Sequence, residues 1–398
     1  YVKKYHILVL NQIASVGLNR LPADHYDVAK NIAQPDAILL RSHDMHAMEV
    51  LPSVKVIGRA GAGTNNIPVD KMSARGIPVL NAPGANANAV KELVLAGLLI
   101  AARNLVPAIR YVDALDKSAP DLEAKVEDGK KQFAGSELPG KILGIIGLGA
   151  IGSLVADTAI KLGMKVIGFD PHITVDAAWR LPSNVRKADS VEDVLKQSDF
   201  VSLHIPLIDV TRGLIDGDRL AIMKPEAALL NFSREGIVDE DSVLSALTRK
   251  KLRYYICDFP AQKSIGHPGV VALPHLGAST AEAEDNCAIM VVDQVREFLE
   301  QGTIANAVNF PNVEMARESP YRVAIANANV PNMLGQISTT MANAKLNIHN
   351  MINKSRGDMA YTLVDVDSPA GAEVIKAIAK INGVLSVRAI PLLNENKR

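Results

Sequence analysis

The glycine-rich segment GLGAIG, residues 147–152, constrains the fold of this chain more than any other feature. It has the spacing G-x-G-x-x-G, directly follows the apolar run KILGII and precedes the helical pattern AIGSLVADTAIKLG. Asp170 closes the next apolar run, KVIGFD. A glycine loop between a strand and a helix, with an acidic residue ending the following strand, is typical of a dinucleotide-binding βαβ unit.

The residues of this unit favour NAD over NADP. The glycines allow a tight turn and a close approach of the backbone to a pyrophosphate, whose charge is stabilised at the helix N-terminus. Asp170 would accept hydrogen bonds from ribose hydroxyls and repel a 2′-phosphate, and residues 171–174 supply no arginine to bind one. The alternative is a glycine-rich turn that keeps this shape without a cofactor. The predicted cofactor-binding residues of the loop are Gly147, Gly149, Ala150, Ile151 and Gly152.

Apolar runs and helical patterns alternate along most of the chain, which indicates parallel α/β units. We expect a discontinuous first lobe over residues 1–85 and 283–312, and a Rossmann domain over residues 86–282. The stretch 86–105 predicts a long, mostly buried helix that connects them. Residues 319–398 follow the order β-α-β-β-α-β, which is the ferredoxin-like unit.

Composition narrows the classes of function. The 43 Lys and Arg residues balance 43 Asp and Glu residues, so no net charge recruits nucleic acid or an anionic membrane. The longest apolar stretch, residues 93–102, is shorter than the roughly 18 residues that span a bilayer. Two cysteines, Cys257 and Cys287, are too few for a disulfide framework, and we therefore expect the protein in a reducing cytoplasm.

Two residues at predicted strand ends are candidates for chemistry. His275 ends the apolar run VVALPH, and Arg234 follows AALLNFS. Ligands of doubly wound folds bind at the carboxyl ends of the strands. Oxidation of a hydroxyl by hydride transfer needs a base for the hydroxyl proton and a cation for the substrate, and these two residues meet both needs. The alternative is that both are structural hydrogen-bonding groups.

Six segments together resemble the D-isomer-specific 2-hydroxyacid dehydrogenase family. They are GRAGAGTNNIP (58–68), NAPGANANAVKEL (81–93), GLGAIG (147–152), HIPL (204–207), NFSREGIVDE (231–240) and PHLGAST (274–280). The resemblance implies two doubly wound, Rossmann-like α/β lobes, one binding substrate and one NAD, followed by a ferredoxin-like ACT regulatory domain. The implied activity is NAD-dependent oxidation of 3-phosphoglycerate to 3-phosphohydroxypyruvate, which begins phosphorylated L-serine synthesis. Other readings are a glycerate or hydroxypyruvate reductase, and a non-catalytic NAD-sensing protein of the same fold.

The resemblance also implies roles for individual residues. His275 is the acid/base, Arg234 binds the substrate carboxylate and keto oxygen, and the amides of Ala60 and Gly61 bind the same carboxylate. The substrate phosphate would be bound by basic residues, for which the candidates are Arg41, Arg59 and Lys131, with solvated surface cations as the alternative. No metal is implied, and a homo-oligomer, dimer or tetramer, is expected. The remaining cofactor-binding candidates are His204, Pro206, Asp258, His275 and Gly277.

The sequence departs from the family at one position. A glutamate that orients the catalytic histidine is replaced by Gln262 when the segment Phe259-Pro260 is aligned. A neutral amide accepts the ring N–H but does not stabilise a protonated imidazole by charge. The alternative is that another acid orients His275, and Glu282 and Glu284 are the candidates because they lie near it in sequence.

In the terminal domain, the resemblance implies an L-serine effector bound by polar residues at two points. Asn329 and Asn347 match these positions, while Asn327 stands where a histidine is frequent. The alternative is an ACT domain that only dimerises.

Overall fold

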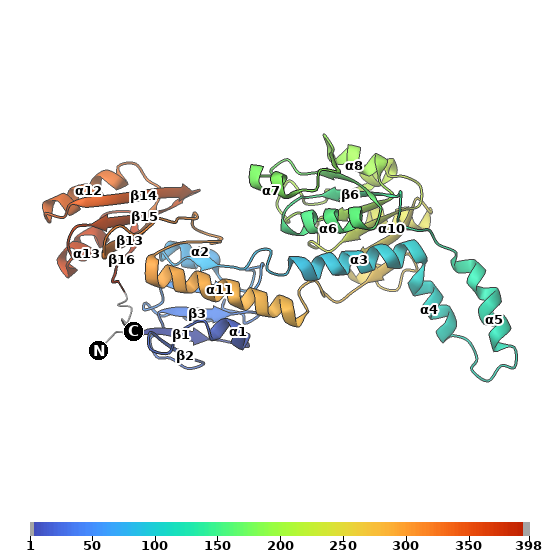
Figure 1. Cartoon of the computed structure of the whole chain (residues 1–398), viewed down its shortest axis with the longest axis horizontal. Helices are drawn as coiled ribbons and strands as arrows, with labels where there is room; N and C mark the ends of the chain where they lie inside the picture. The colour runs from blue at the N-terminus through green and yellow to red at the C-terminus, as the bar shows by residue number, and fades with distance from the viewer. Residues whose placement is uncertain (1–3, 393–398) are drawn as a thin grey trace. The chain divides into compact units, whose positions relative to one another are not determined.

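The structure, a computed structural model, describes residues 4–392. The chain divides into two compact units. Unit 1 combines both ends of the chain, residues 1–85 and 281–398, and unit 2 is the continuous segment 86–280. Both contain parallel sheets with helices, and unit 1 adds an antiparallel sheet, which confirms the predicted fold class (Figure 1).

The first sheet of unit 1 has five parallel strands in the order β2-β1-β3-β4-β5. The long helix α11 (Ala281–Gln301) packs on it so closely that a Cβ on Gly58 would lie 2.7 Å from Val295 and 2.8 Å from Val291. Two short helices, α1 (Ser15–Leu18) and α2 (Val69–Ala74), complete this lobe. The strands are β1 (Tyr5–Val9), β2 (Tyr26–Ala29), β3 (Ala37–Leu40), β4 (Val56–Arg59) and β5 (Val79–Leu80).

The C-terminal part of unit 1 has the predicted β-α-β-β-α-β order. Its antiparallel sheet is ordered β14-β15-β13-β16. Tyr361, Leu363 and Ile390 belong to the same buried cluster as Ile7 and Val295, so the two sheets of unit 1 share a core. The elements are β13 (Tyr321–Ala328), α12 (Met333–Asn343), β14 (Ile348–Arg356), β15 (Met359–Val366), α13 (Ala372–Ala379) and β16 (Val384–Ile390).

A fully buried ion pair also ties the C-terminal sheet to the linker before it. The Arg322 guanidinium donates to both carboxylate oxygens of Asp365, at 2.7 and 2.8 Å. It also donates to the carbonyl oxygens of Gln301, Met315 and Ala316. These bonds occupy all five N–H groups of the guanidinium, which explains how this charge is held inside the protein.

Unit 2 contains a seven-stranded parallel sheet ordered β12-β11-β10-β9-β6-β7-β8. Helices α3 and α6 cover one face, and α8, α9 and α10 cover the other. The strand order reverses between β6 and β9, which is where doubly wound folds bind ligands. The strands are β6 (Ile142–Ile146), β7 (Lys165–Phe169), β8 (Val185–Lys187), β9 (Phe200–Leu203), β10 (Ala227–Asn231), β11 (Leu252–Cys257) and β12 (Val270–Ala272). The helices include α6 (Ala150–Lys161), α7 (Val175–Arg180), α8 (Val191–Gln197), α9 (Gly217–Ile222) and α10 (Glu240–Thr248).

The predicted helix over residues 86–105 is α3 (Ala87–Arg103), and it ends at Asn104, whose φ is +52°. A helical hairpin that the sequence patterns did not indicate follows it, formed by α4 (Leu105–Asp113), α5 (Leu122–Gly129) and the 3-10 turn η1 (Lys130–Phe133) (Figure 1). Within residues 4–392, no single helix has the length and apolar composition to cross a membrane, although α3 and α4 meet both criteria when joined across their 68° bend.

Candidate functional site

The glycine loop after β6 is tightly packed at two of its three glycines and open at the third. Gly147 has a φ of +94°, and a Cβ there would lie 2.3 Å from the carbonyl oxygen of His204. A Cβ on Gly152 would lie 2.0 Å from the carbonyl oxygen of Gly147. At Gly149, in contrast, a Cβ would meet no atom within 4 Å. The second glycine therefore opens onto free space at the N-terminus of α6, which has no side-chain cap.

Asp170 supports this loop directly. One carboxylate oxygen accepts a hydrogen bond from the backbone N–H of Leu148 at 2.9 Å, and the other accepts one from the N–H of His172, also at 2.9 Å. The carboxylate therefore fixes the glycine loop, and its predicted role toward a ribose stays a prediction. This second role of Asp170 was not foreseen from the sequence.

Three polar residues follow three neighbouring strands at the same edge of the sheet in unit 2. Arg234 lies three residues after β10, Asp258 directly after β11, and His275 three residues after β12. The strands are parallel, so these residues share the edge that also carries the glycine loop. The structure thus brings the two candidate catalytic residues to one edge.

Asp258 is the buried carboxylate of this edge, with 2% of its surface exposed. One oxygen accepts a hydrogen bond from the N–H of Gly277 at 3.3 Å, and the other, Oδ1, is buried without a hydrogen-bond partner among residues 4–392. Burial raises the pKa of the Asp258 carboxyl, and the nearby charges of His275 and Arg234 oppose that rise. An unsatisfied buried acceptor is costly unless a ligand pairs with it.

The backbone and ring of His275 are fixed by two neighbours. Its N–H donates to the carbonyl oxygen of Asp258 at 3.1 Å, and its φ is +49°, an uncommon conformation for a side chain of this size. The ring of Phe259 packs against the imidazole, with 4.4 Å between ring centroids.

Gln262 does not orient this histidine in the structure. It lies exposed in the 3-10 turn η2 (Gln262–Ser264), and no hydrogen bond joins it to His275 within the described part of the chain. Asp258 is instead the carboxylate whose charge interacts with His275. Glu284, another acid considered from the sequence, pairs with Arg41 in unit 1.

The loop that carries Arg234 is held by two buried polar residues. The amide of Asn231 donates to the carbonyl oxygen of Arg234 at 3.0 Å and accepts from the N–H of Ser233 at 3.1 Å. The Ser233 hydroxyl donates to the carbonyl oxygen of Leu203, joining the ends of β10 and β9. Sequence reasoning missed both positioning residues, although their polar character at the end of an apolar strand was a usable signal.

His204, at the end of β9, remains neutral near pH 7. Its Nε2 lies 2.8 Å from the hydroxyl of the buried Ser202, and burial lowers the pKa of the His204 imidazole to about 4. Its carbonyl oxygen contacts the glycine loop, as described above. Pro206, two residues on, accepts a hydrogen bond from the Thr211 hydroxyl at its carbonyl oxygen.

In unit 1, four predicted substrate-binding residues occupy the carboxyl ends of two adjacent strands. Arg41 follows β3, and Arg59, Ala60 and Gly61 end and follow β4. The Arg59 guanidinium lies where a Cβ on Gly61 would be, 1.9 Å from that position. Arg41 forms a 2.7 Å ion pair with Glu284 of α11.

These two arginines also face the same buried thiol. Burial raises the pKa of Cys287, while the charges of Arg59 and Arg41 oppose that rise. The structure therefore gathers the two cations at one edge of the first sheet.

Lys131 is not brought to the edge of unit 2 that carries His275. It lies in η1, beside the C-terminal end of α3, where a Cβ on Gly135 would meet the carbonyl oxygen of Ala102. Gly277 packs instead against Val90, near the other end of α3. Twelve helical residues separate these two contacts, about 18 Å along the axis. A role for Lys131 at the edge that carries His275 in its own chain is not supported.

Asn329 and Asn347 lie at opposite ends of the C-terminal sheet. Asn329 follows the last residue of β13, and its side-chain amide donates to the carbonyl oxygen of Gly357. Asn347 precedes β14, and its N–H donates to Asp367. Because β13 and β14 run in the same direction on either side of β15, Asn329 lies level with Asp358 and Asn347 level with Asp367, which are roughly 30 Å apart along the sheet. Asn327 is buried, and its side-chain oxygen has no hydrogen-bond partner in the described part of the chain.

A doubly wound domain with an open glycine loop, an acidic residue after the second strand, and Arg, Asp and His at one strand edge defines a dinucleotide-dependent dehydrogenase. Comparison with known proteins agrees. Residues 96–277 match the family model described as "D-isomer specific 2-hydroxyacid dehydrogenase, NAD binding domain". The chain belongs to this family, which supports NAD as its cofactor.

Relatives with curated names are similar over most of the chain. A D-3-phosphoglycerate dehydrogenase from Methanocaldococcus jannaschii is 31% identical over 93% of this chain and 69% of its own length. One from Haemophilus influenzae is 32% identical over 86% of this chain and 83% of its own. The chain spans only 56% and 62% of the enzymes of that name from Synechocystis and Bacillus subtilis.

A solved structure supports the same fold. The NAD+-bound 3-phosphoglycerate dehydrogenase of Entamoeba histolytica superposes with a TM-score of 0.59 at 24% identity, covering 77% of this chain and 99% of its own.

Proposed function

We propose that this chain catalyses the NAD-dependent oxidation of 3-phospho-D-glycerate to 3-phosphohydroxypyruvate, the reaction that begins phosphorylated serine synthesis. The observation that carries the proposal is the placement of Arg234, Asp258 and His275 after three adjacent strands, on the edge that bears the glycine loop. The choice of substrate is supported by the curated names of the relatives.

The residues of unit 2 hold the cofactor and carry out the proton transfer. When bound, NAD accepts the hydride that leaves C2. The glycine loop binds the pyrophosphate, and the unpaired Oδ1 of Asp258 is an acceptor for the amide of the nicotinamide. His275 takes the hydroxyl proton at a ring nitrogen, and Arg234 holds the substrate carboxylate and the oxygen at C2.

The residues of unit 1 bind the charged groups of the substrate. Arg59 and Arg41 supply positive charge for its phosphate. The backbone amides of Ala60 and Gly61 are the candidates for its carboxylate, although in the structure their N–H groups donate to the carbonyl oxygens of Leu40 and Arg59, both at 2.8 Å, so these two bonds must open when substrate binds. Arg41 is already paired with Glu284. A substrate phosphate that binds Arg41 therefore either breaks this ion pair or binds beside it.

Steady-state kinetics with 3-phosphoglycerate, glycerate and D-lactate tests the proposal. We expect 3-phosphoglycerate to be oxidised with the highest kcat/KM, and His275→Asn to lower kcat about 10²–10⁴-fold, the usual contribution of a general base. The matched control is His349→Asn, the same change at a histidine of β14. Preference for glycerate would indicate a glycerate or hydroxypyruvate reductase, and NAD binding without any turnover would indicate a non-catalytic NAD-sensing protein.

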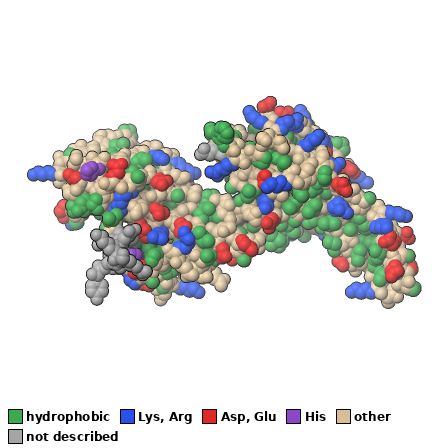
Figure 2. Space-filling view, viewed as in Figure 1, with side chains coloured by type: hydrophobic (Ala, Val, Ile, Leu, Met, Phe, Trp, Pro, Cys, Tyr) green, Lys and Arg blue, Asp and Glu red, His purple; other side chains and the backbone are tan. Residues whose placement is uncertain are grey.

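We also propose that the chain forms homo-oligomers through the hairpin of unit 2. Helix α4 has no buried residue, although it is amphipathic, and Figure 2 shows hydrophobic side chains exposed over this hairpin. Ile109 and Val112 are 59% and 52% exposed, and Leu99, Leu105 and Val126 are each about 40% exposed. Apolar surface of this kind is usually covered by a partner. Analytical ultracentrifugation of the wild type and of Ile109→Asp tests this: dissociation of the oligomer by this change is expected.

A regulatory role for L-serine remains part of the proposal, with a geometric condition. Asn329 and Asn347 are too far apart to bind one amino acid within a chain, so one must come from each of two copies. Isothermal titration with L-serine, compared with Asn347→Ala, checks it. Absence of heat in the wild type would leave the domain as an assembly element.

A cytoplasmic location, expected from the free and buried thiols of Cys257 and Cys287, completes the proposal.

A further inference from the structure

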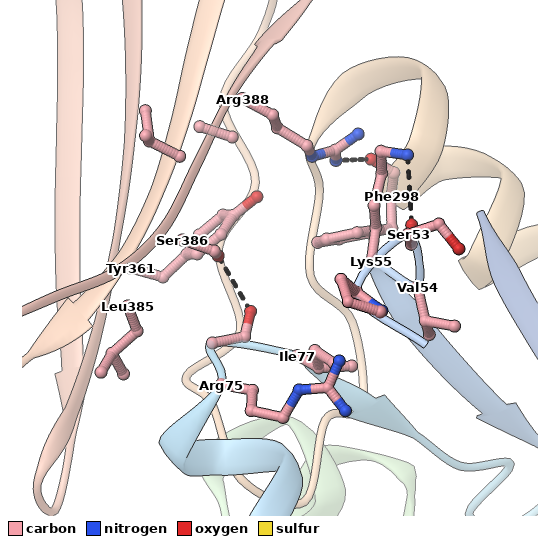
Figure 3. Close-up of a pocket in the computed structure, with 14 residues that line it drawn as sticks. Ser53, Val54, Lys55, Arg75, Ile77, Phe298, Tyr361, Leu385, Ser386 and Arg388 are labelled. Carbon is pink, nitrogen blue, oxygen red and sulfur yellow. Dashed lines mark hydrogen bonds between the residues drawn. The ribbon is translucent and has the colours of Figure 1, made fainter. Parts of the chain in front are cut away.

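Unit 1 contains a cavity of about 480 Å³ between its two sheets, away from the residues discussed above. Figure 3 shows Tyr361, Leu385 and Ser386 of the C-terminal sheet on one wall, and Lys55 and Phe298 on the other. This volume lies in the range of sites for small molecules.

The charge of this lining is one-sided. It includes three cations, Lys55, Arg75 and Arg388, and no acidic residue. Lys55 is paired with the carboxylate of Asp36. No ion pair in the described part of the chain involves either arginine, so two positive charges in the cavity wall lack a counter-charge.

Both guanidinium groups are held in place by neutral acceptors. Arg75 donates to the carbonyl oxygens of Val50 and Leu51, at 2.7 and 3.0 Å. Arg388 donates to the carbonyl oxygens of Leu299 and Phe298, and its guanidinium carbon lies 4.2 Å from the centre of the Phe298 ring. Carbonyl groups position these side chains without neutralising their charge, and each guanidinium keeps further N–H groups for a ligand.

We propose that this cavity binds a small organic dianion, either a phosphate ester or a polycarboxylate. Two guanidinium groups without counter-charges match the charge of such an anion, and their planar N–H pairs suit both phosphate and carboxylate oxygens. The apolar walls, Ile77, Phe298 and Leu385, suit a short carbon chain.

The occupant would join the two halves of unit 1. Arg75 follows α2 of the first lobe, whereas Arg388 lies on β16 of the C-terminal sheet. The halves already touch beside the cavity, where the Ser386 hydroxyl donates to the carbonyl oxygen of Gly76 at 3.0 Å. Lys55 leads directly into β4, whose last residue is Arg59. The cavity therefore borders the segment that leads into the strand carrying the proposed substrate loop.

Calorimetric titration of the full-length protein with inorganic phosphate and with citrate, each at constant ionic strength in chloride, tests the site. We expect saturable binding of at least one probe, and the tighter of the two distinguishes a phosphate from a polycarboxylate site. Arg75→Gln should weaken that binding about tenfold or more, the loss expected for charged hydrogen bonds. Lys71→Gln is the matched control, because it removes the same charge from an exposed position on α2 that does not line the cavity.

Hydrogen exchange of the wild type gives an independent measurement that does not depend on the folding of a variant. The bound probe should slow exchange of the amides at 52–55, 75–77 and 385–388. No saturable binding, equal affinity in Arg75→Gln and the wild type, or protection confined to other segments would each overturn the proposal.

Discussion

Replacing Asp365 by asparagine should destabilise unit 1 strongly, because it leaves the charge of Arg322 buried without a counter-ion. Both side chains are fully buried, and the guanidinium donates two of its five hydrogen bonds to this carboxylate. Asparagine keeps the size of aspartate but presents an NH₂ group toward one guanidinium nitrogen. If the amide oxygen takes the place of Oδ2, it still accepts from Nη2 of Arg322 and from the N–H of Glu318, but the NH₂ group then faces Nε of Arg322.

The expected loss of stability is large for one substitution. Removing one partner of a buried ion pair costs about 3–5 kcal/mol. For a folding unit of roughly 200 residues, a change of 1 kcal/mol moves Tm by about 2–4 °C, so we expect Tm to fall by roughly 6–20 °C. The exposed pair of Glu373 and Lys376 on α13 offers the control, since exposed ion pairs contribute little.

Differential scanning calorimetry of the wild type, Asp365→Asn and Glu373→Gln measures these effects. The transition of unit 1 should shift only in Asp365→Asn. The double variant Arg322→Met with Asp365→Leu removes both charges and should recover part of the loss, although three carbonyl groups still lose their donor. A Tm for Asp365→Asn within about 2 °C of the wild type would refute the reasoning.

Three further predictions concern unit 2. Asp170→Ala should weaken NAD binding by about 1–3 kcal/mol and reduce discrimination against NADP, because ribose hydrogen bonds and the support of the glycine loop are both lost; equal use of both cofactors by the wild type would contradict this. Gly149→Ala should leave Tm unchanged, because its Cβ meets only open space, but it should raise the Kd for NAD because that space is where the pyrophosphate binds. Gly152→Ala should lower Tm itself, because its Cβ would clash with the carbonyl oxygen of Gly147. Calorimetry with and without NAD separates the two effects. Burial lowers the pKa of His204 from 6.5 to about 4. Between these two pH values the imidazole is protonated in the unfolded chain but neutral in the folded one, so the free energy of unfolding should fall as pH drops from 6.5 toward 4. His204→Gln should flatten this part of the stability profile measured by urea unfolding, and an unchanged profile would assign the dependence to other groups.

Much of the fold followed from apolar periodicity. The run DAILL predicted a buried strand, and all four residues of β3 are buried. The edge strand β2 was missed because its sequence, YDVA, is short and half polar. The hairpin of α4 and α5 was missed for a different reason. Helix α4 is amphipathic, but it has only 9 residues, contains Pro107 and directly follows α3, while α5 is mostly polar.

The sequence predicted those site residues that follow directly from the ends of apolar strands. It did not predict the parts of the site that arise from contacts between distant segments. Arg234 and His275 follow apolar strands, and parallel strands end at one edge. The buried Oδ1 of Asp258 and the bonds from Ser233 to the end of β9 arise only when separate strands meet. The separation of Asn329 from Asn347 likewise depends on the directions of strands in a sheet, which residue types alone do not specify.

The division of the chain implies an order of folding during synthesis. Unit 2 is one continuous segment, so it has all its strands once residue 280 has been made. Unit 1 must wait, because its first strand packs against the last part of the chain: the hydroxyl of Tyr5 donates to the carbonyl oxygen of Leu299, 294 residues later. Until then the apolar strands of residues 5–80 lack α11, the long helix that packs on their sheet. Since domains fold as units while the chain emerges, the nascent N-terminal strands are the segment exposed longest to aggregation and to chaperones.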